Sequence, residues 1–108
     1  MDKKKFNLIL DRLLQRTKEG KLEWEKTADV LTYLIVLENS AVSMSLLPSI
    51  DALNFQFRNE NGDVVESAII DDTVAPQAYS LFYLVAEKLN ENENAEKTVN
   101  SILEQLAA

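Results

Sequence analysis

The sequence predicts a two-layer α+β domain with an N-terminal helix, a five-stranded antiparallel meander and two C-terminal helices. Three observations support this prediction. Apolar residues recur with a helical period near both ends of the chain. The middle of the chain contains short runs that alternate or are rich in β-branched residues. The turns between these runs are too short for the crossovers that parallel strands require. We expect the helices to cover one face of the sheet and the 108 residues to form a single domain, 1–108.

The first helix is expected from about Asp2 to Glu19. Lys18 lies in its last turn, where a cation interacts favourably with the helix dipole. Gly20 follows, and glycine adopts the left-handed conformation of a helix C-terminus at low cost. The apolar stripe follows the i, i+3, i+4, i+7 rule through Phe6, Ile9, Leu10, Leu13 and Thr17.

Five strands are expected in the middle of the chain. They are predicted at residues 21–25, 30–37, 41–46, 53–58 and 64–70. The second run is apolar on both faces, which is typical of a central strand or of a strand with one face against a partner. The third and fourth runs alternate cleanly, which is typical of strands with one buried face.

The hairpin between the last two strands has two possible registers. Asn61-Gly62 is a strong hairpin signal. A two-residue loop pairs Phe57 with Glu66, whereas a three-residue loop pairs Phe57 with Val65. A slip of one residue reverses the buried face of a strand. We favour the three-residue loop because it buries more apolar surface.

Two helices are expected after the sheet. The first runs from about Pro76 to Leu89, and proline suits the first turn of a helix. The Asn/Glu run at residues 90–94 interrupts the apolar pattern, so a further helix is predicted from about Ala95.

The composition excludes several kinds of chemistry. The chain has no Cys and no His, which excludes disulfides, thiolate nucleophiles, Cys/His zinc sites and histidine bases. The net charge is −7: residues 1–26 carry eight basic and five acidic residues, and residues 27–108 carry three and thirteen. We therefore expect no nucleic-acid binding, because an acidic domain lacks the electrostatic footprint for phosphate backbones. The asymmetry fits a solvated surface, a head-to-tail contact between copies or a contact with a basic partner.

No secretory signal or membrane span is expected. Lys3, Lys4 and Lys5 precede a short apolar stretch that Asn7 and Asp11 interrupt, whereas a signal peptide needs a longer apolar run. We predict a cytoplasmic protein without membrane contact.

The candidate interaction residues are one tryptophan and one face of two strands. Trp24 serves either as an interface anchor or as a cap on the core. The strand face, if it lies opposite the helices, is small, flat and partly polar. The interaction candidates are Trp24, Thr32, Leu34, Val36, Ser43 and Ser45.

No catalytic, cofactor-binding or metal-binding residue is assigned. The lysines around Gly20 lie at a helix C-terminus, whose carbonyl groups repel anions. The acidic residues near the hairpin and its exit, Glu60, Asp63, Glu66, Asp71 and Asp72, are explained by turns and helix capping. The tyrosines are expected to be core aromatics with a polar tip, and the serines lack a nearby base.

The run from Leu13 to Glu25 resembles the opening of many small bacterial proteins of unknown function. These proteins are similar in a leucine-rich helix, a Thr-Lys-x-Gly-Lys turn and a Trp-containing strand, which correspond here to Thr17, Gly20 and Trp24. The resemblance implies a small bacterial or mobile-element protein located in the cytosol. It implies no activity and no functional residues.

Three functions are compatible with these observations. The favoured hypothesis is a non-catalytic protein-interaction domain of adaptor, chaperone-like or immunity type, with a protein partner or a second copy of itself. A small-ligand-binding domain is the alternative, with a pocket near Trp24 between sheet and helices. A metal-assisted enzyme that uses the acidic hairpin region is the least favoured.

Overall fold

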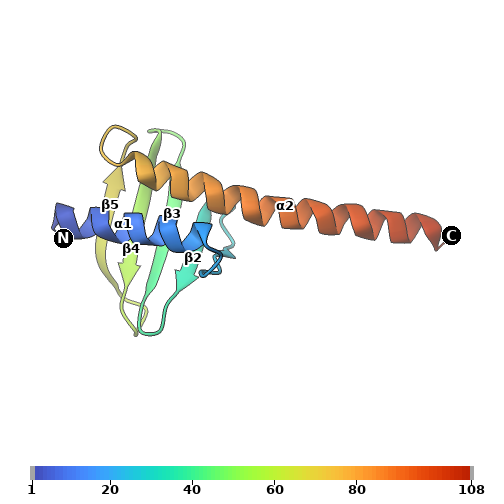
Figure 1. The fold of residues 1–108 in the computed structure, drawn as a ribbon, viewed down its shortest axis with the longest axis horizontal. Helices are drawn as coiled ribbons and strands as arrows, with labels where there is room; N and C mark the ends of the chain where they lie inside the picture. Colours follow the sequence, from blue (N-terminus) through green and yellow to red (C-terminus); the bar gives the residue numbers. More distant parts are fainter. Residues whose placement is uncertain (1, 108) are drawn as a thin grey trace.

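The computed structural model describes residues 2–107, with side chains described for residues 2–90 and 97–107. In chain order, its elements are α1 (Lys3–Lys18), β1 (Glu25–Lys26), β2 (Thr32–Val36), β3 (Ala41–Leu47), β4 (Ala52–Arg58), β5 (Val64–Ile70) and α2 (Pro76–Leu106). The sheet has the order β1-β2-β3-β4-β5 with antiparallel neighbours throughout. Both helices lie on one side of it (Figure 1), which confirms the α+β fold class.

Helix α1 begins and ends at the residues that its sequence favours. The Asp2 side chain accepts a hydrogen bond from the backbone N–H of Lys4 at 3.0 Å, as an N-cap does. At the other end, Gly20 has a φ of +73° and donates its N–H to Thr17 O, while Lys21 donates to Arg16 O. These two bonds form a Schellman motif, which reverses the chain toward the sheet.

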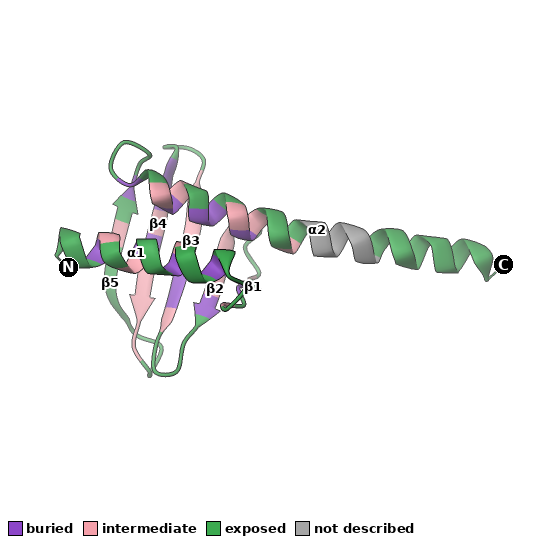
Figure 2. Cartoon of the chain, viewed as in Figure 1, coloured by how far each residue is buried: buried purple, intermediate pink, exposed green. Residues whose placement is uncertain are grey.

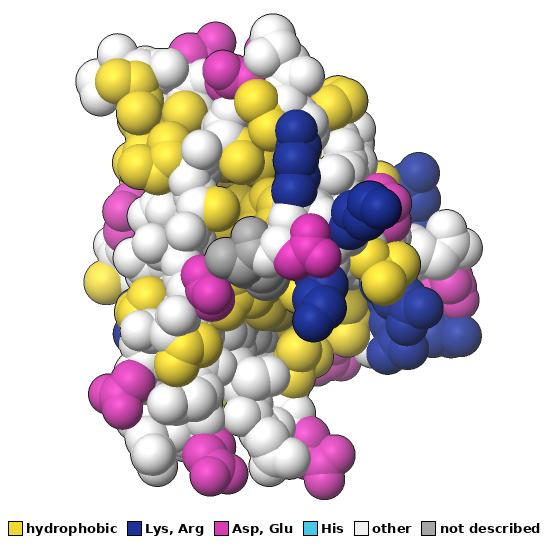
Figure 3. All heavy atoms as spheres, turned by 90° about the vertical axis from the view of Figure 1, so that its left-hand side faces the viewer, with side chains coloured by type: hydrophobic (Ala, Val, Ile, Leu, Met, Phe, Trp, Pro, Cys, Tyr) yellow, Lys and Arg dark blue, Asp and Glu magenta, His cyan; other side chains and the backbone are white. Residues whose placement is uncertain are grey.

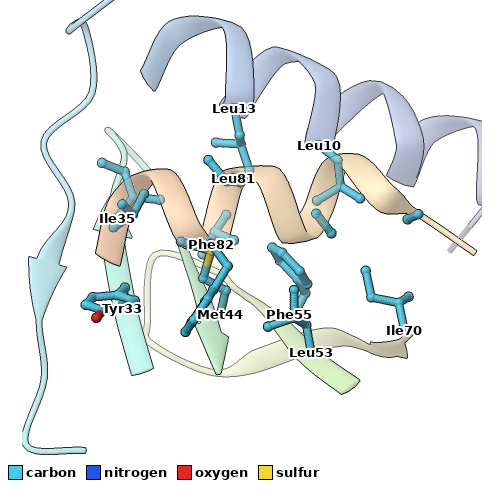
Figure 4. Packing of buried hydrophobic residues seen from close by; sticks show 14 of the residues in the cluster. Leu10, Leu13, Tyr33, Ile35, Met44, Leu53, Phe55, Ile70, Leu81 and Phe82 are labelled. Atoms are coloured by element: carbon cyan, nitrogen blue, oxygen red, sulfur yellow. The ribbon is translucent and has the colours of Figure 1, made fainter. Parts of the chain in front are cut away.

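The core lies between the helices and the inner face of the sheet. Phe6 of α1 contacts Phe55 and Phe57 of β4 edge to face, with ring centroids 5.9 Å apart in both pairs. Tyr33 of β2 packs against Phe82 of α2 at 5.3 Å. Figure 4 shows side chains of both helices pointing toward those of the central strands. Aromatic pairs in these arrangements contribute beyond the area they bury.

Strand β1 is shorter and begins later than the predicted strand at 21–25. It comprises only Glu25 and Lys26, which pair with Leu34 and Tyr33 of β2. The preceding residues leave the Schellman turn without joining the sheet, because the Trp24 side chain is directed into the core and held against α1.

The β4–β5 hairpin begins with the favoured three-residue loop. Asn59 donates its N–H to Asp63 O at 3.0 Å, and its side-chain oxygen accepts from Asp63 N at 3.1 Å. Gly62 has a φ of +85°, the left-handed conformation that closes such a loop. Arg58 consequently pairs with Val64, as this register requires.

A β-bulge then shifts the pairing by one residue. Phe57 pairs with Glu66 and Phe55 with Ala68, so the preferred pairing of Phe57 with Val65 is wrong. The small side chain of Ala68 lies beside the fully buried ring of Phe55, and Glu66 is on an edge strand where it is exposed. A bulge leaves one residue unpaired and bends its strand; here that residue is Val65.

The two predicted C-terminal helices form one continuous helix, α2. The run at 90–94 contains neither Pro nor Gly, so it interrupts the apolar pattern without ending the helix. Beyond Leu89, which packs against the core, α2 projects away from the sheet (Figure 1). The molecule is therefore elongated, with extents of 59 × 31 × 26 Å.

Asp71 organises the turn between β5 and α2. Its Oδ1 accepts hydrogen bonds from the Thr73 hydroxyl at 2.6 Å, from Thr73 N at 3.0 Å and from Val74 N at 3.2 Å. The hydrogen bond from the Thr73 hydroxyl has the largest effect, and together these bonds hold the pKa of the Asp71 carboxyl below its ordinary value of 3.8.

We expect Asp71→Asn to remove a pH-dependent part of the stability. A carboxyl whose pKa is lower in the folded state stabilises the fold above its unfolded pKa, and this contribution is lost as the pH falls through the folded pKa. The wild type should therefore exceed Asp71→Asn in melting temperature at pH 7, and the difference should shrink below the ordinary value of 3.8. Circular dichroism melts at pH 7 and at lower pH measure this, with Asp72→Asn as the control for loss of charge. A constant difference would contradict the prediction.

Candidate functional site

The outer face of the sheet brings together five of the six predicted interaction residues. Tyr33 and Ile35 of β2 are buried in the core, so the alternate residues of this strand point away from the helices. The β2–β3 register places Thr32 opposite Ser45 and Leu34 opposite Ser43. The residues that share this face are Thr32, Leu34, Val36, Ser43 and Ser45.

Hydroxyl groups lie at the centre of the outer face, beside Leu34. The Thr32 and Ser45 hydroxyls are hydrogen-bonded to each other at 2.8 Å. Ser43 is only 8% exposed although it faces outward, because it lies in one row with Leu34 and Gln56, whose side chains are larger. A band of small hydroxyl-bearing side chains therefore runs through the middle of the sheet surface.

Apolar side chains lie at the sides of this band. Val36 is 60% exposed and Ile69 is 63% exposed, and Ile69 pairs with Asn54 on the outer face. The sequence prediction missed Ile69, because the favoured register placed it on the inner face. Only the β-bulge turns it outward. The outer face thus combines a polar centre with uncovered apolar residues at its margins.

Trp24 lies apart from the other five candidates, in the core. It is 7% exposed, and its Nε1 donates to the Thr17 hydroxyl at 3.0 Å. That hydroxyl in turn donates to Leu13 O at 2.6 Å, while Lys88 Nζ of α2 donates to Thr17 O at 2.9 Å. Thr17 therefore connects the turn after α1 with both helices.

A hollow opens beside Trp24. Its volume is about 330 Å³. The apolar part of the lining comes from the chain after α1 and from the last core-packed turns of α2, and Glu23 and Lys88 add charge. The lining residues are Thr17, Leu22, Glu23, Trp24, Val85, Lys88 and Leu89. A concave site with apolar walls and a few polar groups is typical of ligand binding.

The charged residues do not assemble into a metal site in the described part of the chain. No group of three acidic residues there is placed to hold a metal ion.

At the turn after α1, Lys21 Nζ pairs with Glu19 at 2.9 Å. The pKa of the Glu19 carboxyl is lowered by hydrogen bonds, first that with Lys21 and then that with Gln15. Figure 3 shows Lys and Arg side chains gathered on one side of the view and acidic ones spread more widely.

Two of the three tyrosines have defined structural roles. Tyr33 is buried in the core. The Tyr79 hydroxyl donates to Asp51 O at 2.9 Å, and the pKa of Tyr79 is raised first by desolvation and then by the Asp51 carboxylate. A tyrosine whose pKa is raised is a weaker acid, which does not favour a role as a general acid near neutral pH.

Comparison with protein families, with curated proteins and with solved structures finds no match for this chain. The resemblance to small bacterial proteins stays a prediction, as does the cytoplasmic location. Among the described residues, no helix has the length and apolar character needed to cross a membrane.

We expect Thr17→Val to destabilise the fold by leaving the Trp24 N–H without its acceptor. Valine keeps the shape of threonine, but a buried donor without a partner costs about 1–3 kcal/mol. Urea unfolding followed by circular dichroism measures this loss.

A double-mutant cycle with Trp24→Phe provides the control. Phenylalanine has no N–H, so the unfolding free energy lost through Thr17→Val should be smaller in the Trp24→Phe background than in the wild type. Strictly additive losses would show that the hydrogen bond between the two side chains contributes nothing to stability.

Proposed function

We propose that this protein is a non-catalytic protein-interaction domain that acts through the outer face of its sheet. The observation that carries the proposal is the one-sided arrangement of the helices, which leaves the outer face uncovered (Figure 1). An extended sheet face with hydroxyl groups at its centre and apolar residues at its margins fits a protein surface better than a small molecule, which needs a concave site.

The available side chains also support binding rather than catalysis. The chain has no His and no Cys, the residues that most often act as general bases and thiol nucleophiles. The outer face contributes hydroxyl and amide groups from Thr32, Ser45 and Gln56, which can donate and accept hydrogen bonds. An adaptor, chaperone-like or immunity role is compatible with such a surface.

Ser45→Arg tests this proposal. We expect a long charged side chain at the centre of the outer face to weaken partner binding at least tenfold, about 1.4 kcal/mol. The protein is immobilised, its partner is isolated from the source proteome, and the purified pair is measured by calorimetry.

Ser80→Arg is the matched control, because it makes the same change at an exposed position of α2 on the opposite side of the molecule. Equal loss of binding in both variants would place the contact elsewhere. The absence of any specific protein partner would contradict the proposed function.

A second candidate function is small-ligand binding in the hollow beside Trp24. The volume of about 330 Å³ lies near the lower end of the range for ligand sites, roughly 300–1,000 Å³. Trp24 and Leu22 offer apolar contacts there, and Lys88 offers a cation.

If this second function is correct, a ligand should raise the melting temperature and change the Trp24 emission, because Trp24 is the only tryptophan and lines the hollow. Leu22→Glu should abolish both effects, since it places a carboxylate in the apolar wall. A thermal-shift screen of anionic and apolar metabolites without hits, and with unchanged emission, would exclude this candidate.

A further inference from the structure

Another hollow lies beside α1, next to the turn that follows β2, and is called the α1 hollow below. Its volume is about 210 Å³. Figure 2 shows exposed bands along α1 between the buried ones, so one side of this helix borders solvent while the other covers the core. The Leu37 N–H donates to Ser40 O at 2.8 Å, and this turn holds Leu37 at the edge of the hollow. The lining residues are Ile9, Arg12, Leu13, Arg16, Leu22 and Leu37.

The side chains that line the α1 hollow are of two kinds. Four are aliphatic, and two are arginines, whose guanidinium groups donate hydrogen bonds but do not accept them. In the described part of the chain, no side chain of this lining accepts a hydrogen bond. A ligand that fits must therefore combine a hydrocarbon part with an acceptor group, and an anion is the acceptor that suits two cations.

The chain's own carboxylates do not neutralise the two arginines. Arg12 and Arg16 lie four residues apart on α1, where side chains are neighbours and like charges destabilise a helix. Neither arginine forms an ion pair with a carboxylate of the described residues. Glu19, which lines a neighbouring hollow with both arginines, is bonded instead to Lys21 at 2.9 Å and to Gln15 at 3.2 Å. Two guanidinium groups thus stay open beside an apolar surface in a protein of net charge −7.

The carbonyl groups at the end of α1 oppose an anion only weakly at this position. Arg16 O and Thr17 O already accept hydrogen bonds from Lys21 N and Gly20 N. The effect of the helix dipole falls off within the last turn, and Arg12 precedes that turn. A carboxylate held between the two arginines is therefore set back from the helix end.

We propose that the α1 hollow binds a medium-chain carboxylate, with its alkyl chain among the aliphatic side chains and its carboxylate on Arg12 and Arg16. Two arginine forks supply four N–H donors, which match the roughly four lone-pair sites of a carboxylate. A cavity of about 150 Å³ holds a benzene ring. The volume of about 210 Å³ therefore takes an alkyl chain of roughly six to eight carbon atoms.

A protein segment fits this lining less well than a free acid. Each residue of a peptide brings a backbone N–H, and a buried N–H needs an acceptor, which the described lining side chains do not supply. An ionised carboxylic acid has acceptors at one end and no donor. The donor-only lining therefore favours the free acid.

The α1 hollow is distinct from the two sites considered above. Of its described lining residues, only Leu22 also lines the hollow beside Trp24. None of them belongs to the outer face of β2 and β3. The inference therefore does not depend on either function proposed above.

Titration of the full chain with butanoate, hexanoate, octanoate and decanoate, followed by amide chemical shifts in NMR spectra, tests the site. We expect each added CH₂ group to strengthen binding roughly two- to fourfold up to octanoate, because each is removed from water. Decanoate should gain little more, because the hollow is then full. 1-Octanol, which lacks the charge, should bind roughly tenfold more weakly than octanoate. Equal affinity for octanol and octanoate, or no dependence on chain length, would overturn the proposal.

The shifted amides locate the ligand. Octanoate should shift the amides of Arg12 and Leu37, whereas shifts confined to Val85 and Leu89 would place it in the hollow beside Trp24 and overturn the assignment. N-Acetylleucine, which imitates the C-terminal residue of a protein, should bind more weakly than octanoate. The opposite order would assign the site to a protein C-terminus and overturn the free acid as its ligand.

Two matched pairs of variants test the arginines and the apolar wall. Arg16→Gln should weaken octanoate binding roughly tenfold or more. Lys18→Gln removes the same charge but should have no effect, because two residues turn a helix by about 200° and place Lys18 on another side of α1. Leu37→Ser should flatten the dependence on chain length, whereas Val36→Ser, at the neighbouring exposed position on the outer sheet face, should not. Equal effects within either pair would overturn the proposal.

Discussion

The apolar stripes of α1 and α2 cover the same face of the sheet, and the other features of the molecule are arranged around this contact. Phe6 fixes α1 across the sheet through its edge-to-face contacts with Phe55 and Phe57. Phe82 fixes α2 beside it through Tyr33. Two helices suffice for one face of a five-stranded sheet, so the opposite face stays uncovered. The fold itself therefore provides the surface to which we assign protein binding.

The contact between α1 and α2 is anchored by hydrogen bonds at one residue. The Thr17 side chain accepts from Trp24 and donates to Leu13 O, and Lys88 donates to Thr17 O. In this buried environment each group has its partner, which is the condition for a polar group to stabilise a core. Trp24 is held here as a structural residue, and it also forms the wall of the hollow that lies where α2 leaves the core.

The sequence was sufficient for features that depend on local periodicity. The alternation in β2 and β3 correctly assigned Thr32, Leu34 and Ser45 to one face, because neighbouring strand residues point to opposite sides whatever the tertiary context. The register of β5 could not be predicted from local periodicity. The turn chemistry around Gly62 predicted the pairing beside the loop, but the bulge at Val65 depends on how Phe55 and Ala68 pack beneath the helices, and no local pattern reports that packing.

The continuity of α2 is a second feature that the local apolar pattern did not predict. Sequence reasoning separated two helices where the apolar pattern stops, whereas a backbone without Pro or Gly has no reason to end there. In proteins most helical stability comes from tertiary packing, and the core contacts of α2 end at Leu89. Local periodicity predicted the apolar stripe of Val99, Ile102, Leu103 and Leu106, but only the tertiary structure shows that these residues lie outside the core and are exposed in the described part of the chain.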